Sequence, residues 1–348
     1  MEGRLSKPDT MTSIHHFPDG ELDRLGQFLK EEFGGIFSKG NSICVKLHMG
    51  ELNNTAYLRP EIAKVVVDAL KAVEAEPFLF DSLTVYRAHR HTVEDHLNTA
   101  AAHGFTHEAM GCPVVVGPNE EYEEVPTAHL NARVCTALYN ADGMVVLSHV
   151  KGHGCCGFGA AVKNLGMGGL TAQTKSDIHE GARPLILGEC VGCGVCVDEC
   201  EDNNLYIEDG HVHMEDPKKC YGCDRCIISC PQDAMRPRVA LFDTLLAEGA
   251  SACLENKGGK LYFVNVLEKI TKECDCFDRE TTIIHPENLG YLCARNAVSV
   301  DTASVDMVNE ASGRELFKEE NHKDPMLHVK MAEVLGMGDL EYELERHQ

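Results

Sequence analysis

Short apolar runs alternate with amphipathic segments along most of the chain. Six runs of three to seven residues have the length and composition of buried strands: 43–47, 77–80, 114–116, 144–147, 261–267 and 281–284. Apolar positions recur at helical spacing over 62–73, behind a proline suited to a first turn, and also over 92–103, 238–248, 301–311 and 325–335. Strands that alternate with helices predict an α/β fold, in which helices flank a mostly parallel sheet.

Residues 186–236 interrupt this alternation and contain eight of the 17 cysteines. These cysteines form two runs with the spacing CxxCxxCxxxC, namely Cys190, Cys193, Cys196, Cys200 and Cys220, Cys223, Cys226, Cys230. The spacing is that of bacterial iron–sulfur proteins, because three thiolates so placed can surround one face of a cubane. We therefore expect a small α+β domain at 186–236, inserted into a discontinuous α/β domain formed by 1–185 and 237–348.

The paired runs resemble those of bacterial ferredoxins with two 4Fe–4S clusters, in which the fourth ligand of each cluster comes from the other run. The resemblance implies one cluster on Cys190, Cys193, Cys196 and Cys230, and a second on Cys220, Cys223, Cys226 and Cys200. Pro231 follows Cys230 as in the bacterial run, whereas Glu201 follows Cys200 and changes the local charge. Zinc is less favoured, since zinc ribbons use two cysteine pairs with a long spacer.

The net charge of −23 argues against binding to nucleic acid or anionic membranes. Residues 186–234 contain eleven acidic and three basic side chains, so we expect a redox partner protein with a basic docking surface. No apolar run approaches the roughly 20 residues of a membrane span, and the first 41 residues do not have the pattern of a leader. A cytoplasmic protein is expected.

Polar residues follow several of the predicted strands. In open α/β sheets, ligands bind beyond the carboxyl ends of strands, so these residues are candidates for a site, although each is individually consistent with loop packing. They are His48, Glu51, Asn53, Asn54, Arg59, Asp81, His149, Lys151, His153 and the sequence Cys274-Asp275-Cys276.

The segment 149–169 contains seven glycines between Lys151 and Gly169. Such a backbone can approach a ligand closely and can lead into a helix N-terminus that binds an anion, but a tight structural turn accounts for the glycines equally well. The segment matches neither the Walker loop nor the dinucleotide-binding spacing. Lys163 lies within it.

At these residues the chain resembles domain-of-unknown-function family 362, some members of which carry an inserted dicluster ferredoxin. The matching stretches are NTAYLRPE (54–61), DSLTVYRAHR with VEDHLNTAAAHGF (81–105), SHVKGHGCCGFGAAVKNLGMG (148–168), ITKECDC (270–276) and VSVDTASVDMVNEA (298–311). The resemblance implies an α/β fold with iron–sulfur clusters and no settled reaction. A weaker similarity, to the nickel-pincer lactate racemase group, would involve Lys163, His149 and His153.

Cys274 and Cys276 are separated by one residue, so the pair can chelate a soft metal or form a reducible disulfide, or can remain two inert thiols. The sequence favours an iron–sulfur oxidoreductase, or a dedicated electron-delivery subunit, that exchanges electrons with this second site, where an additional metal or small molecule would bind. Lys163, His149 or His153 would supply protons or hold an anionic group, and Asp81 or Glu51 would orient them. A ferredoxin-type carrier or docking protein and a metallocentre maturation protein are the alternatives.

Overall fold

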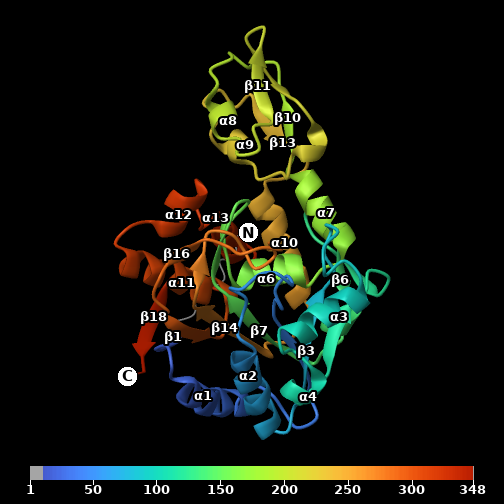
Figure 1. The fold of residues 1–348 in the computed structure, drawn as a ribbon, viewed down its shortest axis with the longest axis vertical. Helices are drawn as coiled ribbons and strands as arrows, with labels where there is room; N and C mark the ends of the chain where they lie inside the picture. Colours follow the sequence, from blue (N-terminus) through green and yellow to red (C-terminus); the bar gives the residue numbers. More distant parts are fainter. Residues whose placement is uncertain (1–10, 348) are drawn as a thin grey trace, which may run out of the picture.

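The structure, a computed structural model, describes residues 11–347 (Figure 1). The first ten residues, part of the segment in which no leader is expected, lie outside this range. Within it, an eight-stranded sheet has the order β18-β1-β17-β14-β7-β2-β3-β4. The strands are β1 (Thr12–Phe17), β2 (Ser42–Lys46), β3 (Glu76–Ser82), β4 (Val114–Gly117), β7 (Gly143–His149), β14 (Leu261–Leu267), β17 (Gly290–Ala294) and β18 (Tyr342–Arg346).

Only β17 runs against its neighbours β1 and β14, and the other adjacent strands of this sheet are parallel. The predicted α/β fold with a mostly parallel sheet is therefore confirmed. Helices cover both faces of the sheet, which explains why its central strands are nearly continuous apolar runs.

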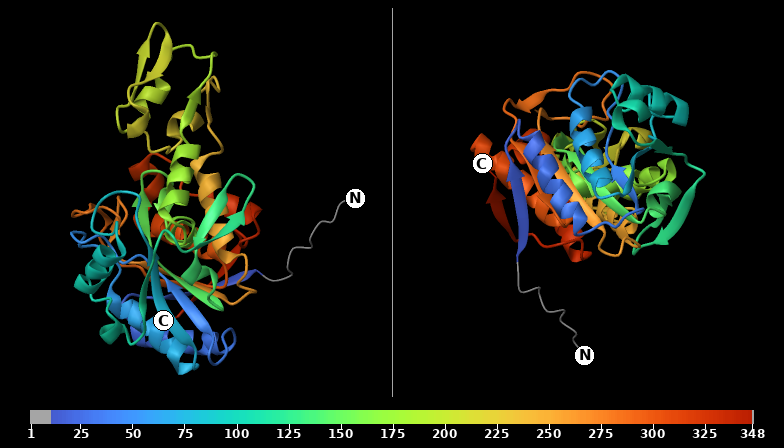
Figure 2. Two further views of the ribbon diagram at one scale, coloured as in Figure 1. Left: turned by 90° about the vertical axis from the view of Figure 1, so that its right-hand side faces the viewer. Right: turned by 90° about the horizontal axis from the view of Figure 1, so that it is seen from below.

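Helices α1 (Leu22–Gly34) and α2 (Pro60–Ala72) cover one face, and α6 (Ala161–Gly168), α10 (Phe242–Leu254), α11 (Ala297–Ser312) and α13 (Leu327–Val334) cover the other (Figures 1 and 2). Side chains along β2 alternate between the two cores, so Val45 packs with α1 and α2 while Cys44 packs in the opposite layer. Further helices are α3 (Val93–Ala102), α4 (His107–Met110), α5 (Thr136–Tyr139), α7 (Ala172–Gly181) and α12 (Leu316–Asn321). Among residues 11–347, no helix has the length and apolar character needed to cross a bilayer.

Residues 184–237 project from one end of the α/β domain (Figures 1 and 2). The chain enters through β10 (Pro184–Ile186) and returns through β13 (Met235–Pro237), which pair antiparallel. Between them lie α8 (Val195–Asp198), the hairpin β11 (Leu205–Glu208) and β12 (His211–Met214), a 3-10 turn (Pro217–Lys219) and α9 (Arg225–Ile228). This projecting module has its own small apolar cluster, and the predicted boundaries, 186 and 236, fall within its first and last strands.

The strand expected at 281–284 is not part of the central sheet. Its counterpart is β16 (Ile283–His285), which pairs with β15 (Ile270–Thr271) in a separate two-stranded sheet. The sheet instead recruits β1 and β18, whose sequences mix polar and apolar residues, and β17, a short buried apolar run that was not among the six predicted strands. Two further hairpins, β5 (Tyr122–Pro126) with β6 (Asn131–Cys135) and β8 (Lys151–His153) with β9 (Gly157–Gly159), lie outside the central sheet.

Candidate functional site

The eight cysteines of the projecting module line two separate cavities. Cys190, Cys193, Cys196 and Cys230 line a small cavity within the module, which we call the outer cysteine cavity. Cys200, Cys220, Cys223 and Cys226 line a larger cavity of about 500 Å³, which we call the inner cysteine cavity. Each cavity thus takes three cysteines from one CxxCxxCxxxC run and the last cysteine of the other run.

The surroundings of these cysteines fit an iron–sulfur cluster. Backbone N–H groups of Gly192 and Val212 point at the Cys190 sulfur, at 3.4 and 3.3 Å, and that of Ala234 points at Cys230 at 3.3 Å. Burial raises the pKa of the Cys226 thiol, and its cysteine neighbours raise it further. Four thiolates gathered in such a place need a cation to neutralise them, and iron would supply that charge.

The inner cysteine cavity extends beyond the projecting module. Its walls include Tyr86, His153, Cys155, Cys276 and Phe277 from the α/β domain. The outer cysteine cavity, by contrast, is bounded by residues 190–235 alone.

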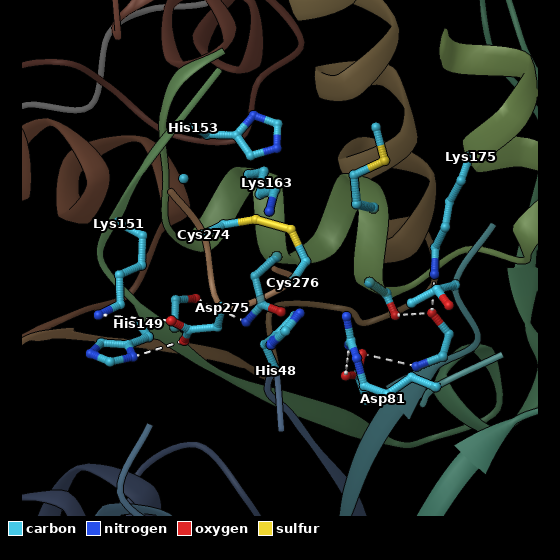
Figure 3. A pocket seen from close by; sticks show the side chains of 18 of the residues that line it. His48, Asp81, His149, Lys151, His153, Lys163, Lys175, Cys274, Asp275 and Cys276 are labelled. Atoms are coloured by element: carbon cyan, nitrogen blue, oxygen red, sulfur yellow. Dashed lines mark hydrogen bonds and ion pairs between the residues drawn. A yellow bond between two sulfur atoms is a disulfide. The ribbon is translucent and has the colours of Figure 1, made fainter. Parts of the chain in front are cut away.

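A third cavity, of about 170 Å³, lies in the α/β domain at the carboxyl ends of β2, β3 and β7 (Figure 3). We call it the α/β cavity. All the residues selected from the sequence as catalytic, Asp81, His149, His153 and Lys163, line it together with Cys274 and Cys276. At roughly 10–15 Å³ for each water, the cavity has room for about ten water molecules or a small metabolite.

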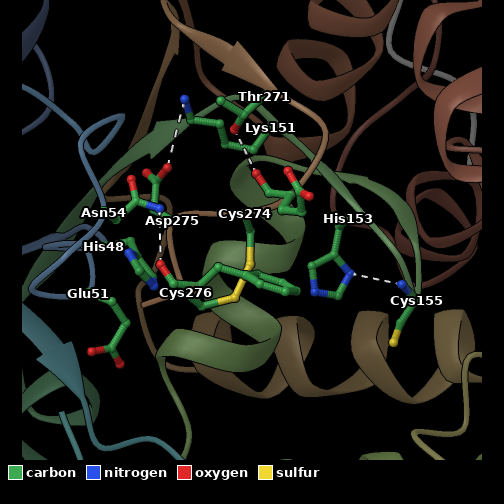
Figure 4. The surroundings of a disulfide bond; sticks show 12 residues. His48, Glu51, Asn54, Lys151, His153, Cys155, Thr271, Cys274, Asp275 and Cys276 are labelled. Carbon is green, nitrogen blue, oxygen red and sulfur yellow. Dashed lines mark hydrogen bonds and ion pairs between the residues drawn. A yellow bond between two sulfur atoms is a disulfide. The ribbon is translucent and has the colours of Figure 1, made fainter. Parts of the chain in front are cut away.

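The segment that contains Cys274 and Cys276 forms one wall of the α/β cavity, and the two cysteines are joined in a disulfide (Figure 4). Residues that follow β2 fix this segment in place. The Glu51 N–H donates to Asp275 O at 3.0 Å, and Asn54 Nδ2 donates to Phe277 O at 3.2 Å. In this state both sulfurs are bonded to one another, so metal chelation stays a prediction for the reduced pair.

His149 and Lys151 form an ion-pair cluster with Asp275. His149 Nδ1 lies 2.9 Å from Asp275 Oδ2, and its Nε2 lies 2.7 Å from Glu268 O. Both ring nitrogens face oxygen acceptors, which favours a doubly protonated ring, whereas burial and the nearby charge of Lys151 lower the pKa of this imidazole. Burial alone would raise the pKa of Asp275, but the positive charges of His149 and Lys151 hold it below its ordinary value. Burial lowers the pKa of Lys151 to about 8.

Asp81, at the end of β3, is enclosed by cations. Lys46 Nζ lies 3.1 Å from Oδ1, while Arg90 Nη1 and His96 Nε2 each lie 3.4 Å from Oδ2. Burial opposes ionisation of Asp81, but Lys46 and His96 hold its pKa well below the usual range. With both oxygens engaged, this carboxylate orients its basic neighbours.

Lys163, His153 and His48 present nitrogens that remain available to a ligand. Lys163 Nζ has no hydrogen bond or ion pair within residues 11–347, and burial lowers the pKa of this amine. The backbone N–H groups of Cys155 and Gly50 donate to Nδ1 of His153 and His48, at 3.2 and 3.1 Å. Burial holds the pKa of both imidazoles well below the usual range, so each ring is neutral and carries its proton on Nε2.

The glycine-rich segment serves packing more directly than anion binding. The N-terminus of α6, where an anion was considered, is capped by Asp301, whose carboxylate accepts from Ala161 N and Val162 N at 2.8 and 2.9 Å. A β-carbon on Gly166 would lie 2.2 Å from Leu246 O, so glycine allows α6 and α10 to approach closely. At Gly159 a β-carbon would lie 2.8 Å from Lys163 Cδ, so this glycine makes room for the lysine stem.

One further group of metal-binding residue types lies at the sheet edge. His15 Nδ1 is 3.1 Å from His347 Nε2 and 3.4 Å from Glu345 Oε2. A hydrogen bond between the two imidazoles accounts for this contact without a metal.

Comparison with known proteins addresses what kind of protein has this site. Residues 43–306 match the family described as a domain of unknown function (DUF362). The chain belongs to this family. The match covers every strand that borders the α/β cavity, and the projecting module of this DUF362 protein lies within the matched range.

Other similarities to this DUF362 protein are distant. A crystal structure from Thermotoga maritima aligns with 86% of this chain and 60% of its own chain, at 9% identity and a TM-score of 0.44. The lactate racemase apoprotein of Thermoanaerobacterium thermosaccharolyticum aligns with 75% and 52%, at 12% identity and a TM-score of 0.35. The archaeal glutamate synthase (NADPH) of Archaeoglobus fulgidus is 40% identical over 47 residues, which are 13% of this chain and 9% of that protein.

Sequence reasoning did not single out Arg90, Lys175 and His179, which also line the α/β cavity of this DUF362 protein. Lys175 Nζ donates to Ser82 Oγ at 2.8 Å, and burial lowers its pKa to about 8. Lys175 and His179 lie on α7, which is remote from the strand ends in sequence, so the strand-end rule could not find them. Thr174, Lys175 and Ile178 follow one another at helical spacing and are buried on one face of α7. This spacing was the signal in the sequence that could have indicated Lys175.

Proposed function

We propose that this protein is an iron–sulfur redox protein that passes electrons through two 4Fe–4S clusters to or from the α/β cavity. One observation carries the proposal. The eight cysteines divide between two cavities in the combination that the ferredoxin resemblance implies, and the inner cysteine cavity shares Tyr86, His153, His179 and Cys276 with the α/β cavity.

The cysteines would hold the clusters, which when bound would store one electron each. The backbone N–H groups aimed at Cys190, Cys200 and Cys230 would stabilise negative charge on those sulfurs. With its excess of acidic side chains, the projecting module favours a partner protein with a basic docking surface.

The α/β cavity is the proposed reaction site. Lys163, which has no hydrogen bond or ion pair to another of residues 11–347, would hold an anionic group, and the Nε2–H groups of His48 and His153 would donate hydrogen bonds to it. Asp81 and Asp275 keep the neighbouring cations in place through the ion pairs described above. A charged cavity of about 170 Å³ beside the cysteines favours this function over that of a carrier with no second site.

Quantifying iron, sulfide and other metals after anaerobic purification tests the proposal. We expect about eight irons per chain, from two cubanes of four. Cys226→Ser should retain about half of the iron. The control Cys112→Ser, at a cysteine outside both cysteine cavities, should retain all of it. Stoichiometric zinc in place of iron, or equal iron content in both variants, would contradict the proposal.

A further inference from the structure

The disulfide between Cys274 and Cys276 lies where two cavities meet. Cys276 lines both the inner cysteine cavity and the α/β cavity, whereas Cys274 lines only the α/β cavity. Both cysteines therefore border the proposed reaction site, and Cys276 also borders the cavity that contains four cysteines of the projecting module. Figures 3 and 4 show the disulfide among its neighbours in the α/β domain.

The disulfide is held at this boundary by its neighbours. Tyr86 Oη donates to Cys276 O at 2.9 Å and accepts from Arg90 Nη2 at 2.7 Å, while Arg90 Nε lies 3.0 Å from Glu51 Oε1. Lys163 lines the α/β cavity together with both cysteines (Figure 3). The main chain of residues 275–277 is thus held by three hydrogen bonds from other segments, which would keep the wall in place when the sulfurs separate and rejoin.

The geometry points to a redox-active disulfide that converts single electrons into a pair. This inference rests on the proposed function, because the single electrons would come through the inner cysteine cavity from a low-potential one-electron donor. Two electrons and two protons convert the S–S bond into two thiols: the first electron gives a disulfide radical anion, and the second gives two thiolates, which take protons from water. The reverse step returns both electrons.

The number of electrons supports this assignment. Two cubanes would hold two electrons, which is the number needed to open one disulfide. Once open, the pair would present Cys274 to the α/β cavity beside Lys163, which favours a small anionic substrate that is reduced or oxidised by two electrons. Metal chelation by the same two sulfurs would require the pair to stay reduced in the resting protein.

Differential alkylation of the anaerobically purified holoprotein tests the inference. Thiols are alkylated under denaturing conditions before and after treatment with reduced methyl viologen, and the peptide that contains Cys274 and Cys276 is quantified by mass spectrometry. We expect this peptide to be unmodified before treatment and doubly alkylated afterwards. The core cysteines Cys44 and Cys293, both fully buried, should be alkylated equally in the two samples.

Two further arms separate the possible failures. Protein stripped of iron should open the disulfide at least tenfold more slowly with reduced methyl viologen, but at an unchanged rate with a phosphine reductant. Cys276→Ser should consume two fewer electrons per chain in a reductive titration while keeping its iron. A holoprotein with about eight irons whose two cysteines are already alkylated, or hold a metal, before reduction would overturn this inference alone, whereas absence of iron would overturn the proposed function.

Discussion

Each of the two cysteine cavities is lined by four cysteines, three from one CxxCxxCxxxC run and the last of the other run, but the two cavities have different neighbours. The outer cysteine cavity is closed by apolar side chains of its own module, including Val191, Ile207 and Met235. The inner cysteine cavity borders His153, Cys155 and Cys276 of the α/β domain. The CxxCxxCxxxC spacing determines which cysteines converge, but the attachment of the module determines which cavity can communicate with the α/β cavity.

Lys323 forms several of the contacts that attach the projecting module to the α/β domain. Its Nζ lies 2.6 Å from Asp224 Oδ1 in the module and 2.7 Å from Asp243 Oδ2 on α10, and it also donates to the carbonyl groups of Cys155 and Cys223. Burial opposes the charge on Lys323, but these carboxylates hold its pKa above the ordinary value. One buried cation therefore joins the inner side of the module to the α/β domain.

Replacing one cysteine in each of the two cysteine cavities should have the largest effect and should reveal the difference between them. We expect Cys196→Ala and Cys226→Ala each to lose about four irons per chain. Only Cys226→Ala should also slow opening of the Cys274–Cys276 disulfide by reduced methyl viologen at least tenfold, because it alters the cavity that borders Cys276. Alkylation time courses on both variants measure the difference, and equal slowing would show that the two cavities do not differ in their access to the disulfide.

The sequence predicted the central strands because those strands are buried on both faces. It did not reveal β1, which contains His15 and His16, or the edge strand β18, since only the completed sheet makes those residues strand-forming. The resemblance to ferredoxins implied which cysteines belong together. No local pattern could indicate that the module faces Cys276, because that depends on Lys323, about 100 residues beyond Cys223 in the sequence.

The residues of the α/β cavity, like the fold, could be predicted from the sequence only in part. Asp81, His149 and His153 follow predicted strands, so the rule for parallel sheets places them at one edge, and all three line the α/β cavity. The rule does not indicate which of these side chains are engaged in ion pairs and which are available to a ligand. Asp81 and His149 are engaged in ion pairs, whereas Nε2 of His153 has no hydrogen bond among the residues that the structure describes. This distinction depends on partners from distant segments such as Lys46 and Asp275.

Removing the charge of Lys323, which joins the projecting module to the α/β domain, should have the second largest effect. In Lys323→Met, Asp224 and Asp243 remain buried without their partner, so we expect a loss of about 3–5 kcal/mol in the free energy of unfolding. Urea unfolding measures this loss. Lys330→Met removes an exposed partner of Asp324 nearby and should leave the midpoint unchanged. A Lys323→Met variant as stable as the control would show that this contact does not fix the module.

A smaller effect on stability should come from the basic side chains in the wall of the α/β cavity. Among residues 11–347, the outer cysteine cavity has no such basic wall. Burial lowers the pKa of Lys175 from 10.5 to about 8. Between these values the unfolded chain binds more protons at this residue than the folded protein, so stability due to Lys175 rises with pH from about 8 to 10.5. Urea unfolding across this range should show the wild type gaining about 2–3 kcal/mol relative to Lys175→Met. Lys64→Met changes an exposed lysine, so the stability of this variant should rise with pH as that of the wild type does. If Lys175→Met shows the same rise, the amine is solvated and keeps its ordinary pKa, and the cavity wall is less enclosed than the contacts of Lys175 with Ser82 and Leu83 indicate.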